Sequence, residues 1–88
     1  MSFYTKGIDL RNEFKKLVSE FMQSQYNCRA AGSGMTQADI FRECGMDWGK
    51  VDNCTSSQQQ FYIVAILKTL ELEGKVERDA ITKKWKLK

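Results

Sequence analysis

Histidine and proline are both absent from this chain, and the first absence narrows the possible chemistry. Without an imidazole, histidine-based catalytic triads are excluded, and so are zinc sites that need a histidine ligand. No two cysteines have the C-x-x-C spacing, and the acidic residues form no paired motif. Gly32-Ser33-Gly34 lacks the spacing of a nucleotide-binding loop. We therefore expect no enzyme, no metal site and no cofactor.

Long apolar runs are also missing. No stretch approaches the roughly 20 apolar residues that a membrane-spanning helix needs, and the first residues show no apolar core of a secretory signal. Cys28, Cys44 and Cys54 are an odd number of cysteines, which predicts reduced, half-buried thiols in a cytoplasmic protein. The length of 88 residues and the 42% hydrophobic content predict one small domain spanning residues 1–88.

The positive charge is concentrated at one end of the chain. Residues 75–88 contain six basic and two acidic side chains, a net charge of +4, whereas the other 74 residues contain eight basic and nine acidic side chains, a net charge of −1. Segregation of this kind indicates that the C-terminal segment faces an anionic partner.

Apolar side chains in the first half of the chain recur with the period of a helix. They predict a first helix over residues 10–25, with Asp9 as its N-cap and one apolar stripe made by Leu10, Phe14, Leu17, Val18, Phe21 and Met22. Gly32-Ser33-Gly34 predicts a flexible connection, and Met35 a short strand residue. Thr36 with Asp39 resembles a capping box, which predicts a second helix over residues 37–44 that stops at Gly45.

A connection over residues 46–55 leads into a longer helical pattern. Trp48 and Val51 are expected to anchor this connection by packing on the helices. The third helix is predicted over residues 57–73, capped by Ser56 or Ser57 and ended by Gly74. Its core face contains Ile63, Ile66, Leu67 and Leu70, but a second apolar face lies opposite, formed by Phe61, Ala65 and Leu72.

After Gly74 the period of the pattern changes from that of a helix to that of a strand. Residues 75–79 and 84–88 each alternate polar and apolar side chains, which predicts a β-hairpin over residues 75–88 with its turn at 79–82. Val76, Trp85 and Leu87 are expected to face inward, onto the third helix. The predicted fold class is therefore α+β, mainly α, with three helices followed by a hairpin.

This order of elements, together with two local patterns, resembles the winged helix-turn-helix superfamily. One pattern is Ile63-x-x-Ile66-Leu67-x-x-Leu70-x-x-x-Gly74-x-Val76, followed by Lys84-Trp85-Lys86-Leu87; it is similar to the family's junction between recognition helix and wing. The other is Thr36-Gln37-Ala38-Asp39-Ile40-Phe41, which is similar to its short second helix. The resemblance implies a DNA-binding domain with a C-terminal hairpin wing.

The first functional hypothesis is a module that binds double-stranded DNA, as a small transcriptional regulator or a DNA-targeting domain. Lysines that neutralise phosphates release counterions and so gain affinity, which favours Lys83, Lys84 and Lys86 on the wing as backbone contacts. Ser57, Gln58, Gln59 and Tyr62 lie where a recognition helix enters the major groove, and glutamine can pair with adenine. For each of these residues taken alone, a solvated helix start or a charged hairpin edge is the favoured explanation, and only the combination points to DNA.

The second hypothesis is a winged helix that binds protein, either as a homodimer or as an adaptor. Its basis is the face formed by Phe61, Ala65 and Leu72, because a helix made for the major groove rarely exposes phenylalanine. The simpler alternative is that Trp48 and Val51, or Phe3 and Tyr4, cover this face within the monomer. Burial of Phe61 and Leu72 therefore separates the two interpretations.

Overall fold

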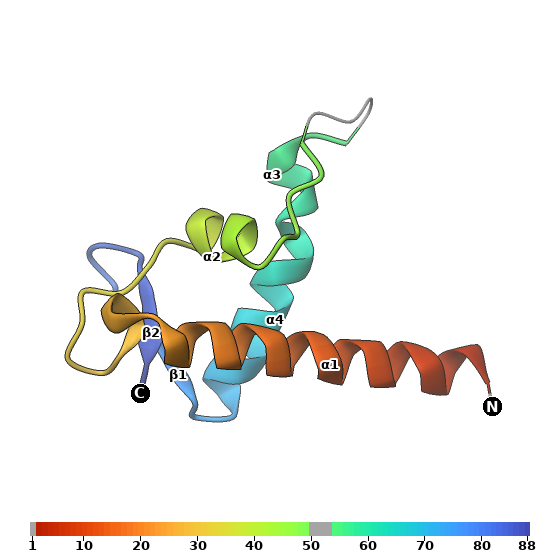
Figure 1. The fold of residues 1–88 in the computed structure, drawn as a ribbon, viewed down its shortest axis with the longest axis horizontal. Helices are drawn as coiled ribbons and strands as arrows, with labels where there is room; N and C mark the ends of the chain where they lie inside the picture. The colour runs from red at the N-terminus through yellow and green to blue at the C-terminus, as the bar shows by residue number, and fades with distance from the viewer. Residues whose placement is uncertain (1, 50–53) are drawn as a thin grey trace.

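The structure is a computed structural model that describes residues 2–49 and 54–88, and it shows a small α+β domain that is mainly helical (Figure 1). The elements follow one another as α1 (Phe3–Ser24), the 3-10 turn η1 (Tyr26–Cys28), α2 (Gln37–Glu43), α3 (Ser56–Gln59), α4 (Phe61–Leu72), β1 (Val76–Arg78) and β2 (Trp85–Leu87). In the part of the chain that the structure describes, no helix is long and apolar enough to cross a membrane.

One hydrophobic core joins all of the longer elements. Helix α1 contributes three buried residues, α4 contributes four, and α2, η1 and the two strands supply the rest: Phe14, Val18, Met22, Cys28, Ile40, Phe41, Ile63, Ile66, Leu67, Leu70, Val76 and Trp85. Helix α1 crosses α4 near its own midpoint (Figure 1), and its C-terminal half packs beside the hairpin. Burial of this set supplies most of the stabilisation available to so small a domain.

The hairpin is antiparallel and has the predicted inward face. Val76 pairs with Leu87, and Arg78 pairs with Trp85. Val76 and Trp85 are buried and Leu87 is half-buried, so the alternation of the sequence is confirmed. The connection between the strands runs over 79–84, longer than the turn predicted at 79–82, although Asp79 N still donates to Lys84 O one step beyond the strands.

The segment between α1 and α2 adds a third extended residue to this hairpin. Met35 and Trp85 form an antiparallel bridge through two backbone hydrogen bonds, from Met35 N to Trp85 O at 2.9 Å and from Trp85 N to Met35 O at 2.7 Å. The prediction of a strand residue at Met35 is thereby confirmed. Gly34 makes this approach possible: its φ is +87°, and a Cβ there would lie 2.9 Å from the Trp85 carbonyl oxygen. The connection around Gly34 is therefore a fixed turn and not the flexible linker that its composition predicted.

Helix α1 begins seven residues earlier than predicted. The hydroxyl of Ser2 accepts a hydrogen bond from Thr5 N at 3.1 Å and caps the helix, so the prediction of Asp9 as N-cap is wrong. The expected apolar stripe is also only partly correct. Phe14, Val18 and Met22 are buried, but Leu10 is 69% exposed and Leu17 is 43% exposed, because α4 crosses α1 C-terminal to Leu10 and off the side of Leu17.

The short second helix agrees with its prediction to within one residue. Thr36 accepts a hydrogen bond from Asp39 N at 3.1 Å and is the N-cap, and Cys44 is the C-cap just before Gly45. Ile40 and Phe41 are buried, as their positions indicated.

The predicted third helix is in fact two helices. Gln60 breaks it, since its N–H donates to Ser57 O in a tight 3-10 turn at 3.3 Å. The N-cap of α3 is Thr55, with Gln58 completing a capping box, so the prediction of Ser57 as cap is wrong; the side chain of Ser56, the other predicted cap, lies outside the described part of the chain. Helix α4 ends at Leu72, one residue before its predicted end; Glu73 is the C-cap, and Gly74 follows it with a φ of +76°.

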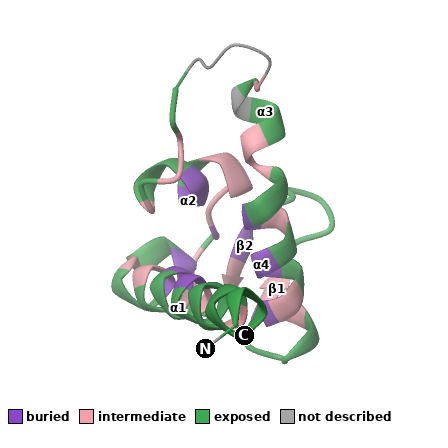
Figure 2. Cartoon of the chain, turned by 90° about the vertical axis from the view of Figure 1, so that its right-hand side faces the viewer, coloured by how far each residue is buried: buried purple, intermediate pink, exposed green. Residues whose placement is uncertain are grey.

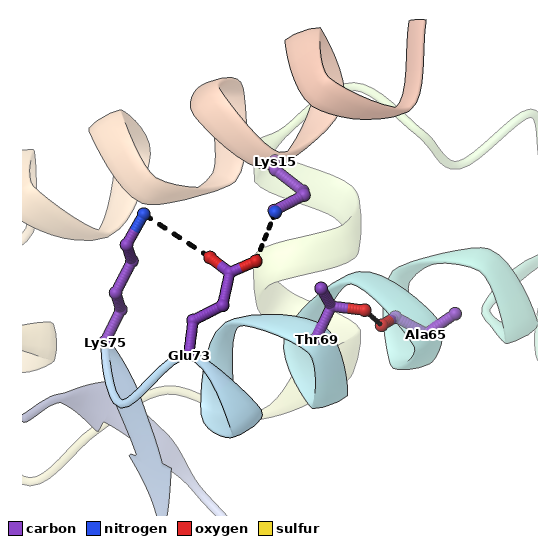
Figure 3. A network of polar contacts seen from close by, with 5 residues as sticks. All are labelled: Lys15, Ala65, Thr69, Glu73 and Lys75. Atoms are coloured by element: carbon purple, nitrogen blue, oxygen red, sulfur yellow. Dashed lines mark hydrogen bonds and ion pairs between the residues drawn. The ribbon is translucent and has the colours of Figure 1, made fainter. Parts of the chain in front are cut away.

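A surface ion-pair cluster connects α1 to the junction between α4 and β1. The carboxylate of Glu73 accepts a hydrogen bond from Lys15 on α1 and pairs with Lys75 at 3.4 Å (Figure 3). The hydrogen bond from Lys15, and secondarily the contact with Lys75, hold the pKa of Glu73 below its ordinary value. One carboxylate thus fixes the angle at which the chain leaves α4 and enters the hairpin.

Candidate nucleic-acid interface

The connection between the two hairpin strands is a rigidly held loop. The Asp79 carboxylate accepts hydrogen bonds from the backbone N–H groups of Ile81 and Thr82, each at 2.8 Å. The backbone closes the loop twice, from Asp79 N to Lys84 O and from Lys83 N to Asp79 O, both at 2.9 Å. The amides of Thr82 and Ile81 hold the pKa of Asp79 below its ordinary value of 3.8. The Asp79 carboxylate is therefore occupied by hydrogen bonds within the loop itself.

The basic side chains of the hairpin differ in what surrounds them. Lys83 is exposed and Lys84 half-exposed, and neither forms an ion pair with any residue that the structure describes. Lys86, in contrast, pairs with Glu77 across the strands at 3.7 Å. Because Asp79 and Glu77 are both engaged, the loop presents Lys83 and Lys84 as positive charges without a competing acid beside them.

Arg78 is a further cation at this end, which the predicted site did not contain. Its guanidinium lies 5.5 Å from the centre of the Trp85 ring, and its Nε donates to Lys83 O at 3.2 Å. It is exposed and adjoins Lys83, so it belongs to the same basic surface. Alternation places Arg78 on the same side of its strand as the buried Val76 and so gives no sign that it is exposed; the one signal in the sequence was its place among the six basic residues of 75–88.

The predicted base-contacting residues lie together on α3 and the first turn of α4, but their polar groups are largely occupied. Gln59 Oε1 accepts from Trp48 N at 2.8 Å, and its Nε2 donates to Gly49 O at 2.9 Å and Cys54 O at 3.2 Å. Gln58 Oε1 accepts from Thr55 N at 2.8 Å. These two amides tie down the connection before α3 and the helix start.

The remaining two predicted contacts are more accessible. Ser57 is exposed on α3. Tyr62 packs its ring against Phe14 of α1 with centroids 4.9 Å apart, and the tyrosine remains 46% exposed. Figure 1 shows α3 at the top of the molecule and the hairpin connection at its left, so the structure does not bring the two predicted clusters together.

Several apolar side chains that were expected to be covered are at the surface. Trp48 is 76% exposed, so its predicted packing on the helices is wrong, and Val51 lies outside the described residues. Phe61 is 73% and Leu72 is 88% exposed, so neither the described part of the connection nor Phe3 and Tyr4 cover the outer face of α4. Trp48 and Tyr62, with Met46, Cys54 and Gln59, line an open apolar hollow of about 280 Å³.

The cysteines behave as small apolar side chains. Cys28 is buried, and Cys44 and Cys54 are half-buried free thiols. Burial, and next the neighbouring carboxylate of Glu43, raises the pKa of Cys44 to about 11, so this thiol is protonated and unreactive at neutral pH. Among residues 2–49 and 54–88, no cluster of three side chains has the types and proximity to hold a metal ion.

Neither a protein-family model, nor a curated protein, nor a solved structure matches this chain.

Proposed function

We propose that this chain is a winged-helix module that binds duplex DNA through the phosphate backbone, with the hairpin as its wing. The order α1, Met35, α2, α4, β1, β2 supports the fold, because Met35 pairs with β2 as a third extended segment of the sheet. The observation that carries the function is the hydrogen-bonded loop over 79–84. It leaves Lys83 exposed and Lys84 half-exposed, while the Asp79 carboxylate accepts hydrogen bonds from the backbone of the loop itself.

The wing is suited to phosphates more than to bases. The hydrogen bonds of the loop fix where the cationic side chains leave the backbone, which reduces the backbone entropy lost on association. Each neutralised phosphate releases a counterion, so three cations on one surface (Arg78, Lys83 and Lys84) favour binding to duplex of any sequence. Lys86, already paired with Glu77, contributes less. Ser57 and Tyr62 remain candidates for phosphate or base contacts at the other end of the domain.

Charge reversal tests this proposal directly. Fluorescence anisotropy with a labelled random duplex in low salt measures affinity for the wild-type chain and for Lys83→Glu. The matched control is Lys16→Glu, which makes the same change in net charge on the exposed surface of α1. We expect Lys83→Glu to weaken binding about tenfold or more and the control to weaken it about twofold. The double variant Lys83→Glu/Lys84→Glu removes most binding; equal effects of Lys83→Glu and Lys16→Glu would contradict a wing-centred interface.

A second candidate function is protein binding through the outer face of α4, and the exposure of Phe61 and Leu72 favours it. With Ala65 these side chains form an apolar surface that nothing described in the monomer covers. A homodimer or an adaptor complex built on this face would be lost in Phe61→Ser. Since Phe61 lies outside the core, the variant should keep the helical circular dichroism of the wild type.

A further inference from the structure

The N-terminal half of α1 extends past the domain. Of residues 2–13 none is buried; the first buried residue of the helix is Phe14, where Tyr62 of α4 meets it. Figure 1 shows these turns continuing beyond α4, and Figure 2, seen from the N-terminal side, shows them as exposed surface in front of the domain. Residues 3–13 amount to about 17 Å of helix. Apart from the half-buried Ile8, the side chains of residues 2–13 are exposed, and turns with so little tertiary packing gain little stability from helix propensity alone.

These projecting turns are not polar, as a solvated extension would be. Phe3 is 90% exposed and Leu10 is 69% exposed. Together with Gly7 and Phe14 they follow spacings of four, three and four residues, so all four positions lie along one line of the helix. This line, the α1 seam, flanks the core-facing side of α1 and reaches the Phe14–Tyr62 pair.

Gly7 sits in the middle of the α1 seam and has no role within the monomer. A Cβ at this position would meet no atom within 4 Å, and the residue is in the interior of a helix, where glycine is unfavourable relative to alanine. A glycine in an exposed helix is useful where another side chain or backbone approaches closely. The gap beside Gly7 has room for a bulky side chain from a second helix, and Leu10 of another copy of this chain is such a side chain.

The charges beside the α1 seam select one orientation for a partner helix of the same sequence. Lys6 and Glu13 lie along one edge of the seam, and Tyr4 and Arg11 along the other. No described residue forms an ion pair with Lys6, Arg11 or Glu13.

In an antiparallel pair of these helices, Lys6 meets Glu13 of the other copy twice by symmetry, and Tyr4 meets Arg11. In a parallel pair Lys6 would face Arg11, two like charges.

We propose that a second copy of this chain docks on the α1 seam, antiparallel, with Gly7 opposite Leu10 and Phe3 beside the Phe14–Tyr62 pair of the other copy. Phe3 and Tyr4 cover roughly 150–250 Å² each when buried. Over two copies, with Leu10 added, the pair reaches the roughly 1,000 Å² that a specific interface needs. The inference does not rest on the proposed function, because the α1 seam and the wing share no residue.

Sedimentation velocity over a range of concentrations tests the docking surface. The wild-type chain is expected to dimerise, and Leu10→Glu to weaken the dimer by at least about 100-fold. Leu72→Glu is the matched control: it makes the same change at another exposed leucine, on α4, and should leave the dimer intact. Both side chains lie outside the core, so circular dichroism should show folded monomers in each case.

A charge exchange tests the orientation separately. Lys6→Glu and Glu13→Lys are each expected to weaken the dimer about tenfold, because each places like charges together, and the double variant Lys6→Glu/Glu13→Lys should restore wild-type association. Gly7→Ala should raise the melting temperature of the monomer and weaken the dimer at the same time, since the added methyl group favours the helix but fills the gap.

Three outcomes would overturn the proposal. A wild-type chain that stays monomeric up to about 1 mM has no dimer of useful affinity. Loss of the dimer in Leu72→Glu or Phe61→Ser, with Leu10→Glu unaffected, would place the interface on α4 instead. A double charge variant that is no better than either single variant would exclude the antiparallel arrangement.

Discussion

The hairpin connection 79–84 and helix α3 differ in what their polar side chains are free to do. In the hairpin, the acid is bound by its own loop and the lysines are left to solvent. In α3, the amide of Gln59 is bonded at both its oxygen and its nitrogen, and that of Gln58 completes a capping box. The lysines of the hairpin connection are available to contact phosphates. The amides of Gln58 and Gln59 on α3 already have partners within the chain, so few groups on α3 are left to distinguish bases.

This contrast teaches that residue type alone does not mark a contact residue. Glutamines at a helix start look like base readers in the sequence, yet the chain uses them to hold the preceding connection. Lysines at a hairpin tip look like solubilising charges, yet the loop beneath them is fixed by five hydrogen bonds of Asp79, Lys83 and Arg78. The internal partners of a polar side chain decide whether it can also serve a ligand.

The largest effect is expected from removing the support of the wing. Trp85 is fully buried, pairs with Met35 and lies under Arg78. Trp85→Ala should lower the free energy of unfolding by about 3–5 kcal/mol, because it leaves a large cavity under the hairpin. Urea denaturation measures this loss. The control Trp48→Ala, at an exposed tryptophan, should change stability by less than about 0.5 kcal/mol; equal losses would show that Trp85 does not anchor the wing.

A smaller effect is expected on the α3 side of the comparison. Gln59→Ala removes three hydrogen bonds to the connection before α3 and should cost about 1–2 kcal/mol of stability. Its affinity for duplex DNA should stay within about twofold of wild type, because the wing carries the binding. Anisotropy and urea denaturation measured on the same variant check both parts. A tenfold loss of affinity with intact stability would instead mark Gln59 as a base reader.

The smallest effect concerns the pH dependence of the wing. Because the pKa of Asp79 is lowered in the folded chain, its contribution to stability is fully present above 3.8 and is lost as the pH falls through the lower folded pKa. Asp79→Asn should therefore flatten part of the fall in melting temperature between about pH 5 and pH 2. Part of the fall should persist in this variant, since Glu73 also has a lowered pKa. An unchanged profile would mean that the loop does not depend on the charge of Asp79.

The sequence predicted those elements whose signals are local. Thr36 and Gly74 mark the start of α2 and the end of α4 correctly, since capping and a positive φ depend on a few neighbouring residues. The inward face of the hairpin followed from its alternation. The early start of α1 was missed because Ser2 and Thr5 precede the apolar stripe, and period-based reasoning begins at the stripe.

The candidate site was less predictable, because the hydrogen bonds within the fold decide which of its polar side chains remain available for a ligand. The break at Gln60 leaves the 3.6-residue period almost unchanged, so the pattern could not show it. Periodicity located both apolar faces of α4 and assigned the core face correctly, but it could not say whether the fold also covers the second face; that depends on how the other segments pack around α4. The bonds of Gln59 reach back to Gly49 and Cys54, across a connection with no regular pattern.

The salt dependence of duplex binding decides whether the wing binds the phosphate backbone. Affinity of the wild-type chain and of Lys83→Ala is measured by anisotropy on two duplexes of unrelated sequence, from low to physiological salt. The account predicts similar affinities for both duplexes, a linear fall of log affinity with log salt, and a slope about one unit shallower in Lys83→Ala. A wild-type chain that binds neither duplex in low salt, or whose binding does not respond to salt, would contradict it.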